Sequence, residues 1–546
     1  MWLSHYIAKI TDQHRAASLF PEKPTIDFYP RSEGSRGGLR VIKASKKTVI
    51  TLTIGPFCAR ETILQDSAGS LFSSRQLRAL TPYRCTFGYD VLVYVGRALF
   101  VEGYNERQIM AALGRKNVPI SAREISYLGK KFIAYLALAH RQSRKRLRQA
   151  MVLRGGYILH LDGTCEGDSL HLVSGIDGIA QIVLDNIKLP SEKAVLLIPF
   201  LRRIKRQYGE PLALVHDMGH GLMSAIAFVF AGVRDFICHF HFLRDIGKDL
   251  FEKEYALIRN RLKKHKIRSV LRQRINVLKK LIGEDDSSVR RLATDIDRGS
   301  IDPLALPKVP LLGAYTLIHW CFDTSALDGY GFPFDCPHLI FYRRLKALHG
   351  LIDKQSIRSR ELARLWRPLT RIVEDQQLSK AAIQMQKKVE VFEKLREALA
   401  IAPPEGKKGL NDDGRDADIK NIEKKVELFR KMIPDTEEYQ KMRAQIDKYW
   451  EKLFADPITV DTPDGQVTIQ PQRTNNLMER FFRDIKRCSR KRCGTISLNR
   501  TLRTILADTP LVKIWITPST KRSSSMVAAH WKSALRKSTL AWRQRN

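Results

Sequence analysis

The sequence predicts an α/β core with a mixed five-stranded sheet and helices, interrupted by a large all-helical insertion and preceded by an N-terminal helical region. Three observations predict this class. Residues 155–242 alternate between strand and helix patterns, residues 251–455 are highly charged with helical periodicity, and residues 88–150 hold short helices joined by turns. At 546 residues the chain exceeds the size of one hydrophobic core, so we expect several domains.

The N-terminal segments differ in composition from the helices that follow them. Residues 1–40 are polar and rich in Gly and Arg, which predicts a flexible basic N-terminus. Residues 41–87 contain the β-branched run KKTVITLTIG and are predicted to form a β segment.

Residues 88–150 have the outline of a helix-turn-helix DNA-binding region. Asn105 can cap one short helix that Gly114 ends, and Ser121 with Glu124 forms a capping box that starts the long helix. The solvent face would offer five basic residues to DNA phosphates: Arg115, Lys116, Arg123, Lys130 and Lys131. An ordinary helical hairpin with a soluble basic face is the alternative.

The predicted core begins at residue 151 with three strand patterns in succession, YILHLD, HLVSGID and QIVLDNIKL. An amphipathic helix capped by Ser191, the strand PLALVHD, a second helix and the strand FICHFHF follow. A meander followed by βαβ crossovers is the order expected of an RNase H-like domain. We therefore place this core at 151–250 and 456–512, with the helical insertion at 251–455 and a basic tail at 513–546.

Three acidic residues are the candidate catalytic and metal-binding residues: Asp162, Asp217 and Glu479. Each has an alternative structural explanation. Asp162 precedes Gly163 and could be a turn residue, Asp217 could cap the following helix, and Glu479 could complete a capping box with Asn476.

The positions of the acids favour a shared site. Asp162 and Asp217 fall at the carboxyl ends of strands expected to be neighbours, where open α/β sheets place their ligands. Glu479 heads a helix whose same face continues with three basic residues, which are further candidates for DNA binding: Arg483, Lys486 and Arg490. Metal chemistry beside a phosphate backbone explains both features.

The charge of the chain predicts a polyanionic partner. Lys and Arg number 94 against 57 Asp and Glu, which gives a formal net charge of +37 and favours DNA. No apolar stretch or leader pattern predicts a membrane role, and the eight cysteines include no CxxC pair, so we expect a cytoplasmic protein with reduced thiols.

The segments DGT at Asp162, HDMGHG at Asp217, CHFHFLRDIGKDL, and TNNLMERFFRDIKRCSRKRCGT at Glu479 resemble the DDE transposases of bacterial insertion sequences, in the Mutator-like branch. The likeness runs from about residue 40 to 512, and the Glu motif with its basic continuation is its most specific part. In that family an RNase H-like core holds the three acids, and a helical insertion separates the second acid from the third.

The resemblance implies metal-dependent DNA cleavage and strand transfer, with two Mg²⁺ or Mn²⁺ ions held by Asp162, Asp217 and Glu479. It also implies binding to the terminal inverted repeats of an element and to target DNA, a homodimer or higher oligomer, and a nucleoid-associated bacterial protein. Relatives often carry a small N-terminal zinc ribbon built from paired cysteines. Residues 41–87 depart from that pattern because they offer only Cys58 and Cys85, and they are interpreted as a degenerate ribbon-like segment.

Cys238 and His241 form a CxxH pair after the last predicted strand, where the family often places such a pair. A single CxxH lacks a second ligand pair, and strand alternation would put the two side chains on opposite faces, so zinc is not favoured. We expect instead a structural role beside the active site, with His241 able to hydrogen-bond DNA or a water of the site.

Two other functions compete with an active transposase. A DNA-binding relic would keep the fold and basic surface without transposing. A related nuclease would cut DNA without joining it.

Overall fold

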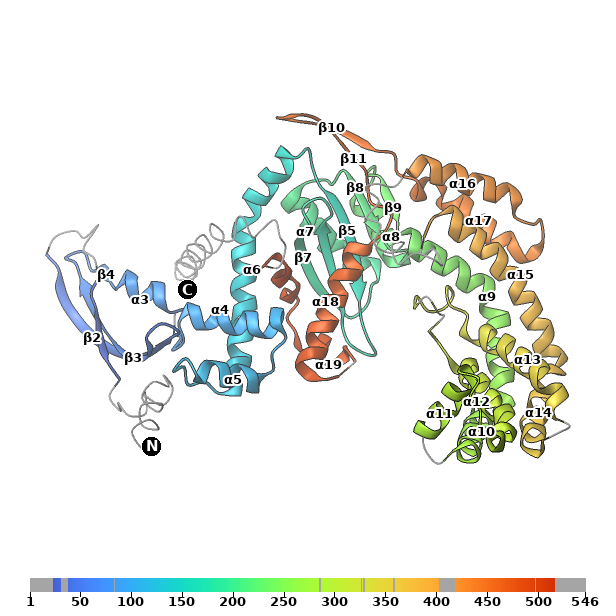
Figure 1. The fold of residues 1–546 in the computed structure, drawn as a ribbon. Coiled ribbons are helices and arrows are strands. Elements are labelled where there is room, and N and C mark those ends of the chain that lie inside the picture. Colours follow the sequence, from blue (N-terminus) through green and yellow to red (C-terminus); the bar gives the residue numbers. More distant parts are fainter. Residues whose placement is uncertain are drawn as a thin grey trace, which may run out of the picture. The chain divides into compact units, whose positions relative to one another are not determined.

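The computed structural model describes residues 23–30, 38–82, 84–283, 286–325, 327, 329–356, 359–401, 418–495 and 497–515. The chain is a mixed α/β protein that divides into two compact units (Figure 1). Unit 1 comprises Met1–Asp235 and Pro457–Asn546, and unit 2 comprises Phe236–Asp456. Unit 1 is therefore built from two stretches of sequence.

A small sheet lies at the N-terminal end of the described chain. β3 (Gly55–Gln65) pairs parallel with β1 (Thr25–Phe28) and antiparallel with β2 (Arg40–Thr51) and β4 (Leu71–Phe72), and α3 (Arg75–Leu80) follows. Phe28 packs in a cluster with Phe57, which fixes β1. The prediction of a flexible segment at 1–40 is thus wrong for Thr25–Phe28; residues 1–22 and 31–37 lie outside the described residues.

Four helical elements follow: α4 (Tyr89–Arg97), the π-helical turn η1 (Ala98–Glu102), α5 (Glu106–Gly114) and α6 (Ala122–Leu153). The predicted caps are confirmed. Asn105 caps α5, and the Ser121 and Glu124 side chains form the reciprocal capping box of α6. This region therefore has the predicted helix, turn and helix.

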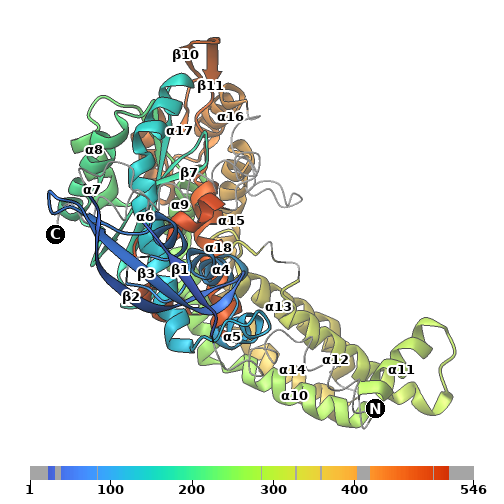
Figure 2. The same ribbon diagram turned by 90° about the vertical axis from the view of Figure 1, so that its left-hand side faces the viewer.

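The central sheet has the strand order β7-β6-β5-β8-β9. Its strand β7 and the long helix α6 are labelled in Figures 1 and 2. β6 runs antiparallel to β5 and β7, whereas β8 runs parallel to β5. The predicted meander and the parallel fourth strand are confirmed. The bounds are β5 (Ile158–Thr164), β6 (His171–Asp177), β7 (Ile182–Leu189), α7 (Ala194–Tyr208), β8 (Ala213–His216), α8 (His220–Val229) and β9 (Asp235–Ile237).

Alternation along the strands gives the sheet two apolar faces. Leu159, Leu161 and Val173 pack with α7 and α8. Leu172 and Ile176 belong to a second cluster with α4, α6 and α18 (Asn476–Cys493). Both faces of the central strands are thus covered, and α18 lies on the face opposite α7.

Two local predictions in this region are wrong. α7 begins at Ala194 with Lys193 as its N-cap residue, so Ser191 is not the cap. The last strand stops at Ile237, and α9 (His239–Lys264) starts within the run predicted as FICHFHF. Residues 239–243 are all buried. When every side chain of a segment is buried, the spacing of its apolar residues does not distinguish a strand from a helix.

Unit 2 is helical from α9 onward in its described residues. α9 packs against α13, α15 and α17. No helix in the described part of the chain is long and apolar enough to cross a membrane. The remaining elements of unit 2 are α10 (Ile267–Ile282), α11 (Asp286–Asp297), η2 (Pro303–Lys308), α12 (Val309–Phe322), α13 (Pro337–Ser356), α14 (Arg360–Val373), α15 (Gln376–Ala398), α16 (Ile419–Met432) and α17 (Glu437–Leu453).

The chain returns to unit 1 through the predicted hairpin, β10 (Ile458–Thr462) and β11 (Gly465–Ile469). Its turn is formed by Pro463 and Asp464, one residue earlier than the predicted Asp464 and Gly465, because Gly465 already pairs with Thr462. α18, α19 (Asn499–Thr504) and η3 (Thr509–Trp515) complete the unit. Most of the predicted basic tail, from residue 516, lies outside the described residues.

Candidate active site

Asp162 lies inside β5 and not at its end. It pairs with Ser174 of β6, and the strand continues to Thr164. Only 7% of Asp162 is exposed, and its Oδ1 accepts a hydrogen bond of 2.7 Å from the backbone N–H of Gly163. Asp162 is therefore not a turn residue at a strand end, because the backbone on both sides of it belongs to the sheet.

Asp217 comes directly after β8, beside Asp162. The parallel register pairs Leu161 with His216, so the two aspartates follow paired residues on neighbouring strands. Gly219 is the N-cap residue of α8 and donates its backbone N–H to Asp217 Oδ1 at 3.2 Å. Asp217 is therefore not the helix cap, and the predicted placement at adjacent strand ends is confirmed for this residue.

Glu479 stands in the first turn of α18, which packs against β5. No side-chain cap forms at this helix start, so the capping box proposed as an alternative with Asn476 is absent from the described residues. The side chain of the N-cap residue Asn475 instead forms a hydrogen bond with the backbone of β5. Its Nδ2 donates to the carbonyl of Leu161 at 2.9 Å, which brings the start of α18 next to the strand of Asp162.

The three acids influence one another electrostatically. Burial raises the pKa of Asp162 well above its usual range, and the negative charge of Asp217 raises it further. The hydrogen bond from Gly163 acts in the opposite direction, and Glu479 adds a smaller increase. Three elements far apart in sequence, β5, the end of β8 and α18, thus direct negative charge to one buried carboxyl group.

Glu192 is a fourth acid near Asp162, and no sequence motif singled it out. Its charge also raises the pKa of Asp162, and it bonds His171 Nδ1 at 3.0 Å. A Cβ atom on Gly163 would lie 2.2 Å from Glu192 Oε1, so the absence of a side chain at Gly163 makes room for this carboxylate. The sequence signal was the glycine that follows Asp162, which by itself indicates only a turn.

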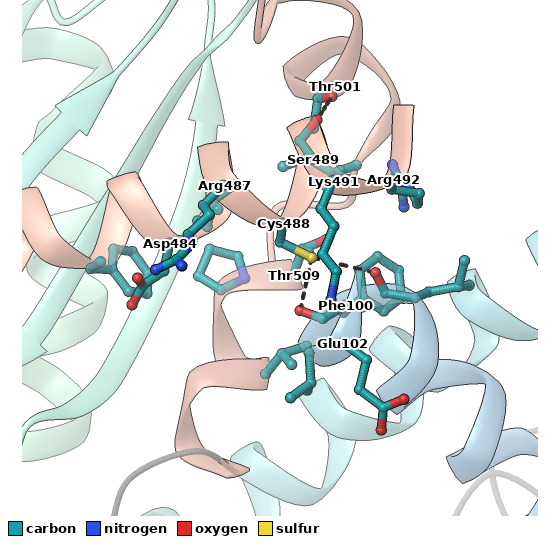
Figure 3. Close-up of a pocket in the computed structure, with 17 residues that line it drawn as sticks. Phe100, Glu102, Asp484, Arg487, Cys488, Ser489, Lys491, Arg492, Thr501 and Thr509 are labelled. Atoms are coloured by element: carbon teal, nitrogen blue, oxygen red, sulfur yellow. Dashed lines mark hydrogen bonds between the residues drawn. The ribbon is translucent and has the colours of Figure 1, made fainter. Parts of the chain in front are cut away.

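The exposed face of α18 carries the predicted basic residues. Arg483, Lys486 and Arg490 are all solvent-exposed. The opposite face of the helix packs over η1 and η3 beside a cavity of about 480 Å³ (Figure 3). There the Cys488 thiol donates to the carbonyl groups of Leu99 and Phe100 at 3.4 and 3.3 Å. These contacts hold α18 so that its cationic face is turned to solvent.

The basic residues predicted for the N-terminal helices are also accessible. Arg115, Lys116, Arg123 and Lys130 are exposed, whereas Lys131 is half-buried, with Nζ 5.5 Å from the centre of the Tyr127 ring. Exposure is compatible with DNA binding and equally with a soluble helical hairpin, so DNA binding here stays a prediction.

Cys238 and His241 both belong to unit 2, whereas the acids belong to unit 1. Strand alternation does not place these residues on opposite faces, because Cys238 is the N-cap residue of α9 and His241 lies in its first turn. Both are buried. Burial lowers the pKa of His241 to about 3, assisted by the positive charges of Arg244 and Lys248. A neutral buried side chain in the helix start fits a structural role.

Metal binding has mixed support from the geometry. The described residues contain no group of three or more His, Cys, Asp and Glu side chains arranged to hold a metal ion. The chemistry of the acids nevertheless fits Mg²⁺, which prefers carboxylate oxygens, and a cation would relieve the repulsion that raises the pKa of Asp162. The acids therefore fit a metal by chemistry and charge, without forming a complete ligand set.

The sequence matches no known family model and no curated protein.

Proposed function

We propose that this chain is a DDE transposase that uses divalent metal ions to cleave DNA strands and join them to target DNA. The single observation that carries the proposal is the convergence of Asp217 and Glu479 on the buried carboxyl group of Asp162. A buried carboxyl group that two further carboxylates repel is unfavourable for stability alone and is typical of a functional site.

The architecture supports an RNase H-like core for this activity. The sheet order β7-β6-β5-β8-β9, with β6 antiparallel to its neighbours and β8 parallel to β5, agrees with a meander followed by βαβ crossovers. The helical unit Phe236–Asp456 interrupts unit 1 between the second and third acids. We interpret it as the helical insertion of such a transposase.

Asp162, Asp217 and Glu479 would hold two Mg²⁺ or Mn²⁺ ions. When bound, such ions neutralise charge on the reacting phosphate and promote attack by an oxygen nucleophile. The chain supplies the carboxylates, and the hydrogen bonds to Asp162 and Asp217 orient their oxygens. Glu192 would add negative charge beside Asp162 and strengthen cation binding.

The basic face of α18 would guide DNA toward the acids. Arg483, Lys486 and Arg490 continue the same helix from Glu479 and are exposed. Contacts of these side chains with successive phosphates would place the backbone alongside the carboxylates. A dimer or higher oligomer, in which two DNA ends are held together, is part of the proposal.

A strand-transfer assay tests the proposal. Purified protein is incubated with the DNA that flanks its own gene, a target plasmid and Mg²⁺, and joined products are separated by electrophoresis. We expect joined products from the wild type and a loss of at least about 100-fold for Asp162→Asn, Asp217→Asn and Glu479→Gln, since each removes a metal-binding charge. The control is Asp461→Asn, which changes an exposed aspartate of β10.

The outcomes separate the competing functions. Cleavage without joining would support a nuclease, and retarded but intact DNA would support a DNA-binding relic. Equal activity of Asp162→Asn and the wild type would contradict both the transposase and the metal-dependent nuclease.

A further inference from the structure

A second charged cavity lies at the edge of the central sheet in unit 1. It has a volume of about 400 Å³ and is lined by residues of α6, β7, α7 and the segment before η3. This volume falls in the usual range of ligand pockets, about 300–1,000 Å³. None of the proposed catalytic residues lines it.

Arginines dominate the charge of this cavity. Four line it, Arg141 and Arg144 from α6 and Arg203 and Arg206 from α7, against the two carboxylates of Asp185 and Asp508. Arg203 forms an ion pair with Asp185, and Arg141 lies 3.6 Å from Asp508.

The four arginine charges outnumber the two carboxylates of the cavity, although Arg144 also acts electrostatically on Asp508. Within the part of the chain that the structure describes, Arg144 and Arg206 have no ion-pair partner, so the cavity keeps an excess positive charge. Such an excess favours an anionic ligand.

Asn186 adds a buried polar residue to the lining of the cavity. It lies on β7, lines the cavity and is only 4% exposed. Neither its Nδ2 nor its Oδ1 has a hydrogen-bond partner among the described residues. A buried amide without partners costs about 1–3 kcal/mol, so the side of the cavity formed by β7 is polar and unsatisfied.

The chain's own C-terminal sequence does not provide a side chain with the required charge. After Asp508 the sequence contains no Asp or Glu. Arginine guanidinium groups bind phosphate oxygens in a forked geometry, and a cavity lined by four arginines matches a phosphate group.

We propose that this arginine cavity is a phosphate-binding site, separate from the acids, that takes a backbone phosphate of DNA. The phosphate assignment rests on the cavity itself, whereas DNA as the source rests on the proposed function. The site would fix the position of the duplex on unit 1 without taking part in chemistry.

Two arginine substitutions and one matched control test the site. Arg144→Gln and Arg206→Gln each remove a positive charge from the cavity. Arg206 is exposed, so its substitution leaves the core intact. Arg202→Gln makes the same change one turn earlier on α7 at another exposed arginine, which lies outside the cavity.

Thermal denaturation with inorganic phosphate, compared with chloride at equal ionic strength, measures binding of the group alone. We expect phosphate to raise the denaturation temperature of the wild type and of Arg202→Gln, and to have a clearly smaller effect on both cavity variants. Equal phosphate effects on all four proteins would overturn the proposal.

Binding of a fluorescent DNA duplex across a salt series identifies the source of the phosphate. Loss of one phosphate contact should reduce the slope of log K against log salt by about 0.9 in each cavity variant. A reduced phosphate effect with unchanged DNA slopes would show that the site takes free phosphate, which overturns the DNA assignment. Neither measurement needs strand transfer, so failure of this proposal and failure of the proposed activity are distinguishable.

Discussion

Asn475 bonds His160 across 315 residues of sequence. The Asn475 Nδ2 group donates to the carbonyl of Leu161, so its Oδ1 faces the His160 ring and accepts from Nδ1–H at 3.0 Å. His160 is fully buried, and burial lowers its pKa to about 4, so the ring is neutral with its proton on Nδ1. This pair attaches the start of α18, and with it Glu479, to the strand of Asp162.

Replacing Asn475 with Ala should therefore weaken both the fold and the site. The change leaves His160 Nδ1 and the Leu161 carbonyl buried without their partner, which costs about 1–3 kcal/mol. Urea denaturation followed by circular dichroism measures the loss. Mg²⁺ should also stabilise this variant less than the wild type, because the position of Glu479 is less fixed.

The control for this prediction is Asn421→Ala on the exposed surface of α16. Its stability should stay within about 0.5 kcal/mol of the wild type. If Asn475→Ala is as stable as this control, the link between α18 and β5 has no energetic importance.

Gly221 should not tolerate a side chain. It lies in the first turn of α8, and a Cβ atom there would stand 1.9 Å from the backbone oxygen of Glu192. Backbone atoms cannot rotate away, so Gly221→Ala should destabilise the protein by about 1–3 kcal/mol and displace Glu192. Denaturation midpoints measure this loss.

The same substitution at Gly313 in α12 serves as the comparison, because a Cβ atom there would meet no other atom of the described residues within 4 Å. Alanine in that helix should be neutral or stabilising by up to about 1 kcal/mol. If Gly221→Ala and Gly313→Ala change the stability equally, the backbone of Glu192 does not pack closely on α8.

The basic face of α18 predicts a measurable salt dependence. Arg483→Gln, Lys486→Gln and Arg490→Gln should each reduce the salt slope of DNA binding by about 0.9, and should weaken binding to all sequences alike. Fluorescence anisotropy with two unrelated duplexes tests this. Lys424→Gln, an exposed position of α16, is the control; slopes no lower than this control would exclude α18 from DNA contact.

His241 should make stability fall in acid. Its pKa is about 3 in the folded protein and about 6.5 when unfolded, so the unfolded state binds the extra proton between these values. Its contribution to stability is complete above about pH 6.5 and is lost progressively as the pH falls toward 3.

Urea denaturation at pH 7 and pH 4.5 measures this effect. His241→Gln should lose less stability between the two pH values than the wild type. The exposed His220 provides the comparison, and His220→Gln should follow the wild-type pH dependence. An unchanged pH dependence in His241→Gln would show that this histidine does not govern acid stability.

Local patterns predicted much of the fold. The caps at Asn105 and Ser121 and the hairpin turn at Asp464 depend on neighbouring residues only, so the sequence is sufficient to locate them. The adjacency of Asp162 and Asp217 followed from strand order and the parallel crossover.

Features that depend on distant contacts were missed. Glu192 approaches Asp162 because Gly163 leaves space, which no periodicity reveals. The aromatic run at 239–242 is buried on all sides, and its apparent alternation suggested a strand where α9 begins. Asn475 resembled an ordinary residue near a helix start, whereas its partner lies on a strand formed much earlier in the chain.

The division of unit 1 into two stretches has a consequence for synthesis on the ribosome. Asp162 and Asp217 emerge early, but Glu479 and Asn475 emerge only after the whole of Phe236–Asp456 has been translated. Until then His160 lacks its amide partner and the sheet face that α18 covers stays open. The nascent chain therefore cannot bring Glu479 to Asp162 and Asp217 before the helical unit has been translated.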